Sequence, residues 1–367
     1  MPTSKAGSKM LNPKQHGFYM PAEFAPHSAT IMIWCERGGS WTYGAKNARP
    51  IFAQIIKAIA KGERVYLAVS PSGRASARQL LSSQIKNGSV ELWEVETNDC
   101  WARDMAPTFV TNGKKLSGID WRFNAWGGEA DGLYPEWDKD DKFAAEACRL
   151  LNTDSISARP FVLEGGSIHS NGAGTVITTE ECLLSAGRNP NLSKAQIEKN
   201  LKNYLGANRV IWLPYGVVDD ETNGHVDNIC AFVNADTVVL GWTDEAGEQH
   251  NRCKADLEVL EGAGIKAIKL PFPKKAVSFT QYDLDGFKYE NGEIERSLTD
   301  SLAASYVNFY ICNAAVLVPQ FGDENDKTAV EILASCFPDR EIFPFDAREI
   351  IKGGGNVHCL TQQIPKA

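Results

Sequence analysis

The residue best suited to chemistry is Cys359, which follows three consecutive glycines at positions 353–355. Glycines let the backbone turn tightly and come close to a ligand. A thiolate nucleophile needs a partly exposed, polar setting, and a glycine turn next to Asn356 offers one. Residues 357–361 favour a short strand. Because a free cysteine is also often a small core residue, this local pattern alone leaves both interpretations open.

A histidine and an aspartate stand two positions apart, at His225 and Asp227. Residues two apart in a strand point to the same side, so we expect these two side chains to face the same space. By the same rule the side chain of His358 points away from that of Cys359. We therefore interpret His358 as structural rather than catalytic.

Asp104 and Glu164 bring the set to a cysteine, a histidine and three carboxylates. The thiolate attacks an electrophilic carbon, the histidine moves protons to a leaving group and from a water, and one carboxylate orients the histidine. The two remaining carboxylates suit a guanidinium, which is planar, permanently cationic and matched to carboxylates through paired hydrogen bonds. This set indicates hydrolysis of a guanidine to a urea with loss of ammonia.

Each of these residues also has an ordinary structural explanation. Asp104 follows Arg103, and adjacent pairs of this kind are usually surface charges. Glu164 precedes two glycines and could simply begin a turn, and a lone histidine such as His225 is more often a satisfied polar residue than a catalyst. These residue types also bind zinc, but only His225 and Asp227 have a spacing typical of ligands, so we expect no metal and no cofactor.

A recurring unit of the chain can bring these residues together. It consists of a polar, glycine-rich strand, a turn, a second strand, an amphipathic helix and an apolar strand, and it recurs about five times. The predicted helices are 49–60, 141–151, 193–205, 254–260 and 327–337, and the predicted strands include 28–34, 64–69, 160–163, 209–213, 237–240, 266–270, 306–311 and 315–318. Such units cannot bury their faces alone, so we expect them to close into a ring or to stack. Polar residues at equivalent openings then converge on one central place.

The bulk composition excludes several classes of protein. The 367 residues are 43% hydrophobic and 23% charged, as in a globular chain. No apolar run reaches the roughly 18 residues of a membrane span, and a net charge of −8 argues against nucleic acid as a partner. Nine cysteines without Cys-x-x-Cys pairs indicate reduced thiols and a cytoplasmic location. We expect residues 1–19 to be a loose tail without a secretory signal, and residues 20–367 to be a single catalytic domain.

Longer motifs carry a resemblance over nearly the whole chain. They include Met20-Pro-Ala-Glu-Phe-Ala-Pro-His27, Cys100-Trp-Ala-Arg-Asp104, Leu163-Glu-Gly-Gly-Ser-Ile-His169, Asp220-Glu-Thr-Asn-Gly-His-Val-Asp-Asn228, Ala303-Ala-Ser-Tyr-Val-Asn-Phe-Tyr310 and the segment 353–363. With these motifs the chain is similar to the agmatine deiminases (agmatine iminohydrolases) of the pentein superfamily, which modify guanidino groups. Cys35 and Ile364 depart from residues common in that family, but neither has a proposed catalytic role.

The resemblance implies an α/β fold, a five-bladed, pseudo-symmetric α/β propeller (pentein fold) of ββαβ-type repeats. It implies hydrolysis of agmatine to N-carbamoylputrescine and ammonia through a covalent thiouronium intermediate on Cys359, a step toward putrescine. In this scheme His225 is the acid and base, and Glu164 is its partner. Asp104 and Asp227 clamp the guanidinium.

The resemblance also points to binding residues and a partner. Glu221 matches a position that the family uses in binding agmatine, and we expect it to serve the far amine, although an acidic segment at 219–221 is also typical of a solvated loop. Trp101 is expected to line the channel. From the family we expect a homo-oligomer, a dimer. Three tryptophans could cover the site or could simply be packed: Trp121, Trp126 and Trp137.

Other functions compete with this one. A deiminase of peptidylarginine needs an open cleft, and an amidinotransferase must exclude water. A non-catalytic pentein should lack the nucleophile or the histidine, whereas Cys359 and His225 are both present. A cysteine peptidase needs an oxyanion hole and a peptide groove, for which the sequence gives no signal.

Overall fold

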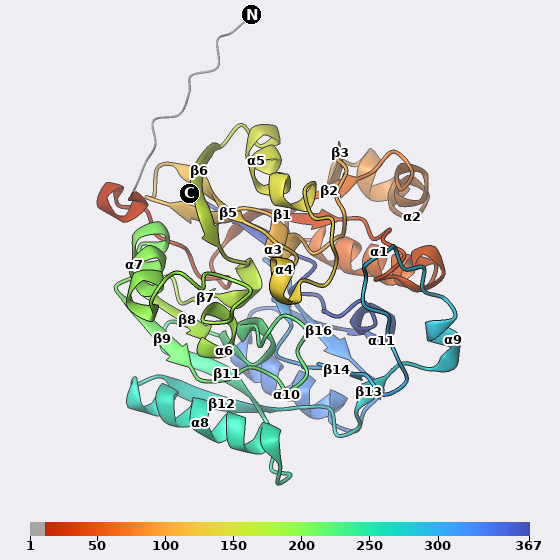
Figure 1. Cartoon of the computed structure of the whole chain (residues 1–367). Helices are drawn as coiled ribbons and strands as arrows, with labels where there is room; N and C mark the ends of the chain where they lie inside the picture. The colour runs from red at the N-terminus through yellow and green to blue at the C-terminus, as the bar shows by residue number, and fades with distance from the viewer. Residues whose placement is uncertain (1–11) are drawn as a thin grey trace, which may run out of the picture.

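Five of the sheets share one pattern of strand pairing in the computed structural model, which describes residues 12–367 (Figure 1). In each of these sheets the first strand pairs antiparallel with the second, and a helix then leads to a third strand that pairs parallel with the second. Figure 1 shows the short helices α3 and α4 near the middle of the molecule, with α5, α7 and α8 at its periphery. The expected α/β fold of ββαβ-type repeats is confirmed.

Four of the repeats are continuous in the chain. The second repeat consists of β4 (Thr108–Thr111), β5 (Leu116–Arg122), α5 (Asp140–Leu150) and β6 (Asp154–Val162). The third consists of β7 (His169–Ser170), β8 (Thr175–Thr179), α7 (Lys194–Leu205) and β9 (Arg209–Leu213). The fourth consists of β10 (Cys230–Phe232), β11 (Thr237–Trp242), α8 (Glu248–Gly262) and β12 (Lys266–Pro271), and the fifth of β15 (Tyr310–Ile311), β16 (Ala315–Gln320), α10 (Asp326–Cys336) and β17 (Glu341–Asp346).

The first repeat is assembled from both ends of the chain. The C-terminal strand β18 (Gln362–Pro365) pairs antiparallel with β1 (His27–Ile33), and β1 continues through α1 (Ala48–Ile59) to the parallel strand β2 (Arg64–Val69). The first repeat is therefore not continuous in the chain, unlike the recurring unit that the sequence predicted. The last strand thus completes the first sheet and holds residues 362–365 against β1. The sequence also gave no prediction of α2 (Arg74–Lys86) and β3 (Val90–Glu94), which extend this sheet.

Local sequence signals account for several element boundaries. Helix α7 begins after Ser193, whose side chain and that of Gln196 form the predicted reciprocal capping box. It ends at Gly206, which adopts a left-handed conformation with φ 67°. In α1, Phe52, Ile55, Ile56 and Ile59 are buried and share the helical spacing that predicted this helix.

The predicted tail is too long. Residues 1–11 lie outside the described residues, but Pro13–His16 forms a 3₁₀ turn and Phe18 is buried. The backbones of Tyr19 and Thr111 exchange two hydrogen bonds of 2.9 Å. Residues 12–19 therefore pack on the second and third repeats.

Two other boundaries differ from the predictions. Helix α8 is longer than the predicted 254–260, because its first two turns are polar and give no apolar periodicity. The predicted strand 306–311 is reduced to β15.

A long insertion separates the fourth and fifth repeats. It contains the two-stranded sheet of β13 (Val277–Ser278) and β14 (Ser301–Leu302), and between them α9 (Gln281–Leu284) and a loop without regular structure. The short helices that bear on the site are α3 (Ala102–Met105), α4 (Gly128–Asp131), α6 (Glu180–Leu183), α11 (Arg348–Ile351) and the 3₁₀ turns Gly165–Ser167 and Val226–Asn228. In the described part of the chain, no helix combines the length and the apolar character that crossing a membrane requires.

Candidate active site

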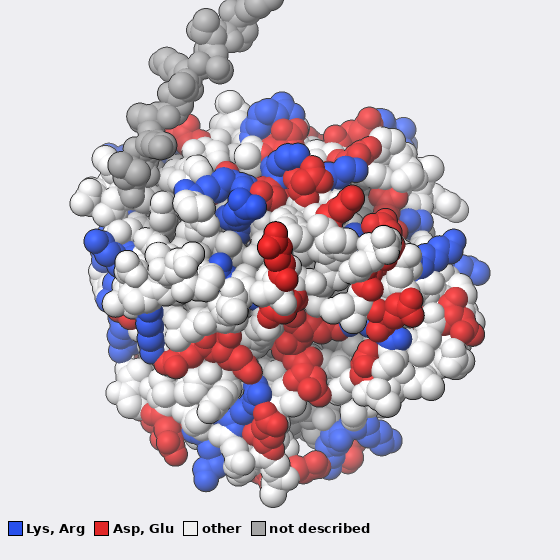
Figure 2. All heavy atoms as spheres, viewed as in Figure 1, with Lys and Arg blue, Asp and Glu red and all other residues white. Residues whose placement is uncertain are grey.

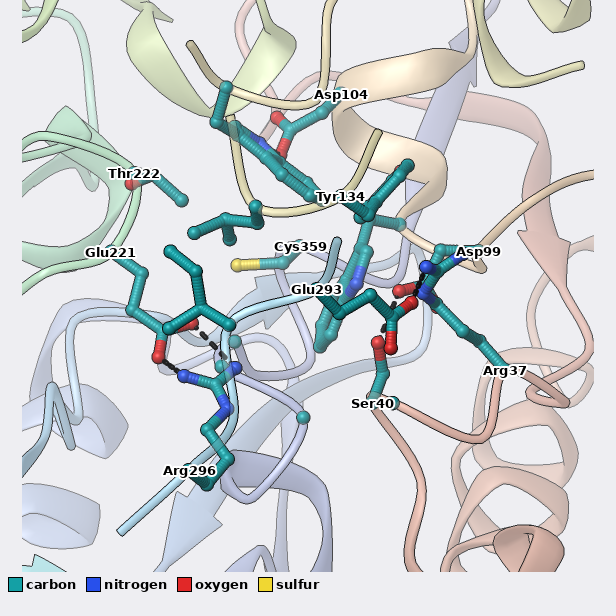
Figure 3. Close-up of a pocket in the computed structure, with 18 of the residues that line it drawn as sticks. Arg37, Ser40, Asp99, Asp104, Tyr134, Glu221, Thr222, Glu293, Arg296 and Cys359 are labelled. Atoms are coloured by element: carbon teal, nitrogen blue, oxygen red, sulfur yellow. Dashed lines mark hydrogen bonds and ion pairs between the residues drawn. The ribbon is translucent and has the colours of Figure 1, made fainter. Parts of the chain in front are cut away.

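Cys359 lies in a turn and not in the predicted strand, since β18 begins only at Gln362. Its carbonyl oxygen accepts a hydrogen bond of 3.0 Å from the backbone N–H of Arg103. Its sulfur accepts one of 3.1 Å from the side-chain amide of Asn308. The sulfur points into a cavity of about 250 Å³ (Figure 3). The largely buried thiol thus faces a cavity large enough for a small molecule.

The glycine run is needed for close packing beside the sulfur. A Cβ atom added to Gly355 would lie 2.7 Å from the ring of Trp101 and 3.1 Å from the sulfur of Cys359. Trp101 lines the cavity, as predicted, and stacks on Trp41 with ring centroids 5.4 Å apart. Only a residue without a side chain lets the turn pass between this indole and the thiol.

His225 and Asp227 do converge, but on a helical turn instead of a strand. His225 precedes the 3₁₀ turn Val226–Asn228, and both side chains are about 1% exposed. Both side chains point toward the backbone of Gly166. A Cβ atom there would lie 2.6 Å from Nδ1 of His225 and 2.9 Å from a carboxylate oxygen of Asp227 and from one of Asp104. The structure therefore places three of the predicted residues around one glycine.

Glu164 is fully buried behind His225. Its Oε2 lies 3.7 Å from Nε2 of His225, and its Oε1 lies 3.0 Å from Nε of Arg188. Burial raises the pKa of Glu164, but the Arg188 guanidinium and His225 outweigh burial, so the pKa is lowered overall. Glu164 is thus a carboxylate that can orient His225 and stabilise its protonated form. Arg188 was not among the predicted site residues.

Asp104 lies on α3, and both of its carboxylate oxygens accept hydrogen bonds. Oδ1 accepts a hydrogen bond of 2.8 Å from the N–H of Gly166, and Oδ2 accepts one of 2.9 Å from the indole N–H of Trp126. Burial raises its pKa to about 6. His225 opposes the rise, and the charges of Asp227 and Glu164 add to it.

The nucleophile and the histidine have raised pKa values. Burial raises the pKa of Cys359, and the carboxylates of Asp227 and Asp104 raise it further. Burial lowers the pKa of His225, but Asp104 and other neighbours outweigh burial, so the pKa is raised overall. These groups alone favour a thiol beside an imidazolium, and a cation bound between the two aspartates would favour the thiolate.

His358 has a contact that strand alternation did not predict. Its Nδ1 lies 2.8 Å from Oδ2 of Asp227, and its Nε2 lies 2.8 Å from Oε2 of Glu23. The interpretation of His358 as non-catalytic fits its lack of contact with the cavity, but the residue is tied directly to the site. Glu23 and Asn308 were also not singled out, although both lie in matching motifs.

Two ion pairs flank the outer part of the cavity. Glu221 pairs with Arg296 on one side, and Glu293 pairs with Arg37 on the other (Figure 3). The Arg37 guanidinium also lies 4.2 Å from the ring centroid of Tyr134. Glu221 lines the cavity as predicted, but its carboxylate already has a cationic partner. The inserted loop supplies Arg296 and Glu293, and no motif of the sequence marked this segment.

The cavity is acidic despite these arginines. Five carboxylates and two arginines line it: Asp99, Asp104, Glu221, Glu293, Asp300, Arg37 and Arg296. Figure 2 shows acidic side chains gathered over the middle of this face of the molecule. Such a cavity favours a ligand with more than one positive charge.

The three tryptophans have different environments. Trp126 lines the cavity and donates to Asp104. Trp121 is packed in the core and donates a hydrogen bond of 2.9 Å to Thr108, and Trp137 packs against the core without lining the cavity. Only Trp126 can therefore cover a bound ligand from its present position.

Among residues 12–367, two groups of buried side chains have the residue types of metal ligands: Glu164, Cys182 and His225, and Glu23, His169 and His358. In the first group His225 and Glu164 belong to the set described above. In the second group both ring nitrogens of His358 are already bound to carboxylates. The absence of a metal remains a prediction, and a chelator can test it.

The fold and the site define a class of protein, an α/β propeller in which a cysteine faces an acidic cavity and a histidine and two aspartates surround one glycine. The family model described as Porphyromonas-type peptidyl-arginine deiminase matches residues 19–365. The chain belongs to this family.

Individual relatives carry a more specific name. A Selenomonas ruminantium protein named "Putative agmatine deiminase" is 51% identical over 365 residues, which cover 97% of this chain and 98% of that protein. A solved structure of agmatine deiminase of Enterococcus faecalis is 40% identical, covers all of both chains and has a TM-score of 0.92. A C. jejuni agmatine deiminase variant solved with substrate bound is 25% identical, with a TM-score of 0.80 over 95% of this chain and 97% of that one.

Proposed function

We propose that the protein hydrolyses agmatine to N-carbamoylputrescine and ammonia. The observation that carries this proposal is an acidic cavity lined by Cys359 and Asp104, with His225 and Asp227 facing Asp104 across Gly166. The names of the relatives support the same substrate.

The two aspartates would hold the guanidinium. Oδ1 of Asp227 is buried without a hydrogen-bond partner, and Oδ2 of the same residue lies 3.7 Å from the sulfur of Cys359. Asp104 lies across Gly166 from it. A guanidinium bound to both carboxylates would place its central carbon near the sulfur and stabilise the thiolate by its charge.

The reaction would proceed in two steps. The thiolate of Cys359 forms a bond to the guanidinium carbon, and the C–N bond to one terminal amino group breaks as protonated His225 gives that group a proton, so that ammonia leaves. The resulting thiouronium is attacked by water, from which His225 takes a proton. The C–S bond then breaks, the electron pair returns to sulfur, the remaining hydroxyl proton is lost to solvent, and the ureido product leaves. Glu164 would stabilise the imidazolium in both steps.

The first test measures ammonia and ureido-product release from agmatine, free arginine and a peptide with a C-terminal arginine. We expect selective turnover of agmatine that survives incubation with a chelator. The inserted loop supplies part of the cavity lining, including Glu293 and Arg296. Preferred turnover of the peptide would instead support a peptidylarginine deiminase, and loss of activity on chelation would contradict the metal-free mechanism.

The far amine of agmatine should contribute to binding through Glu221. Pentylguanidine has a methyl group in place of this ammonium, and we expect its KM to exceed that of agmatine by about tenfold or more, since one charge-assisted hydrogen bond is worth about 1.5–3 kcal/mol. In Glu221→Gln this preference should shrink. An equal preference in the variant and the parent would show that Glu221 does not bind the amine.

The loss of activity at low pH should report the protonation of Asp104. Its pKa is raised to about 6, and only its ionised form attracts a guanidinium. We therefore expect kcat/KM for agmatine to fall as the pH drops through about 6. A profile that is flat from pH 5 to 7 would contradict a clamping role for Asp104.

Two properties remain predictions. All nine cysteines are free thiols in the structure, which is in keeping with a reducing, cytoplasmic location. We also expect a homodimer, which light scattering of the purified protein would test.

A further inference from the structure

His358 lies between two buried carboxylates. Its two ring nitrogens are each 2.8 Å from a carboxylate oxygen, one on Asp227 and one on Glu23. All three side chains are at most 5% exposed. Burial and the nearby Arg103 guanidinium lower the pKa of His358, but the two carboxylates outweigh them, so the pKa is raised overall. A doubly protonated ring can donate to both acids at once.

Glu23, at the far end of this chain of hydrogen bonds, is held in place by other hydrogen bonds of its own. Glu23 accepts one hydrogen bond of 3.0 Å from Arg103 and another of 2.9 Å from the backbone N–H of Ile311. Arg103 also donates to the carbonyl oxygen of His358 at 3.3 Å and, through its backbone, to that of Cys359. Arg103 therefore holds both Glu23 and the turn that carries Cys359.

The other groups that face His358 do not compete for its protons. His169 stacks on it with ring centroids 6.0 Å apart, and burial lowers the pKa of His169 to about 4, so this ring is neutral. Nδ1 of His169 accepts a hydrogen bond of 3.3 Å from the N–H of Phe232. Because the stacked His169 ring is neutral, it does not oppose a positive charge on His358.

The two oxygens of Asp227 are in different situations. Oδ2 is bound by His358, whereas Oδ1 is buried and has no partner. Burial raises the pKa of Asp227, but His358 outweighs burial, so the pKa is lowered overall. The contact with His358 thus fixes the rotation of the carboxylate and keeps it ionised.

We propose that His358 is a positioning residue for the guanidinium: held by Glu23, its Nδ1–H fixes Oδ2 of Asp227 so that Oδ1 is presented to the substrate. This inference rests on the proposed function. His358 touches neither the cavity nor the reacting atoms, and it acts only through Asp227.

Two substitutions separate the two hydrogen bonds of His358. The amide nitrogen of glutamine reaches the position of Nε2, so His358→Gln keeps a donor to Glu23 and removes the donor to Asp227. The amide nitrogen of asparagine reaches the position of Nδ1, so His358→Asn keeps the donor to Asp227. Both variants lose the positive charge and are similar in size, which makes them a matched pair.

The measurement is the Kd of agmatine in a Cys359→Ala background, which requires no turnover. We expect His358→Gln to raise the Kd about tenfold or more and His358→Asn to raise it much less, since a charge-assisted hydrogen bond is worth about 1.5–3 kcal/mol. His169→Asn, which keeps an acceptor for Phe232, should leave the Kd unchanged. In the active enzyme, His358→Gln should also add the ionisation of Asp227 to the acidic limb of kcat/KM that Asp104 sets, because Asp227 loses a donor to its ionised form.

Equal affinities of the parent and His358→Gln would overturn the proposal, as would equal losses in the Gln and Asn variants. If His358→Gln does not fold, a tenfold loss of affinity in folded His358→Asn would overturn it. No binding of agmatine to Cys359→Ala would refute the clamp itself. Failure of the proposed function is seen separately, as absence of ammonia release by the native enzyme.

Discussion

Cys359→Ala is expected to abolish turnover of agmatine, with a loss of at least about 10⁴-fold in kcat. The reason is that Cys359 is the single cysteine among the described side chains that line this cavity. The substitution removes only the sulfur, and its partner Asn308 keeps a hydrogen bond to Asn228. The fold and the two aspartates should therefore remain, and agmatine should still bind.

The measurements are kcat, the thermal midpoint of unfolding and the Kd of agmatine. Cys336→Ala is the matched control, since Cys336 is half-buried on α10 and lies outside the cavity. That variant should keep full activity. In the native enzyme, acid quenching during turnover should trap a protein whose mass is increased by agmatine minus ammonia. Turnover by Cys359→Ala close to that of the native enzyme would remove this residue from the mechanism.

His225→Gln should lower kcat by about 10³-fold, because the same imidazole acts as acid for ammonia and as base for water. The raised pKa of His225 keeps a proton available for the first step. A glutamine can donate a hydrogen bond to Glu164 but cannot transfer a proton. We expect KM to change much less than kcat, since the two aspartates bind the substrate.

Steady-state kinetics with agmatine test this prediction. His250→Gln is the control, because His250 lies on α8 and contacts only the carbonyl oxygen of Thr243 among the hydrogen bonds of the described residues. It should retain native kcat. A loss in His225→Gln that is confined to KM would show that the histidine binds substrate and does not transfer protons.

The sequence by itself determined several of the elements and indicated the chemistry. The apolar spacing of α1 and the capping box of α7 are local signals, and strands β2 and β9 have the predicted bounds. The combination of a cysteine, a histidine and three carboxylates also indicated a guanidine before any geometry was known. Such signals survive in sequence because side-chain type and short-range periodicity are local properties.

Tertiary structure decided which of these segments meet. β18 completes the sheet of β1, a pairing between the two ends of the chain that no local pattern specifies. His225 and Asp227 lie next to and in a 3₁₀ turn, and both face Gly166. Strand alternation correctly predicted that the two side chains face the same space, but the two residues do not lie in a strand.

The same limit applies to the charges of the site. The contact of His358 with Glu23 joins residues 335 positions apart, and the contact of Glu221 with Arg296 joins residues 75 positions apart. The sequence showed that these side chains are ionisable, but their pairing depends on which loops the fold brings together. Burial then sets their pKa values, because desolvation is a property of the folded surroundings and not of the residue type.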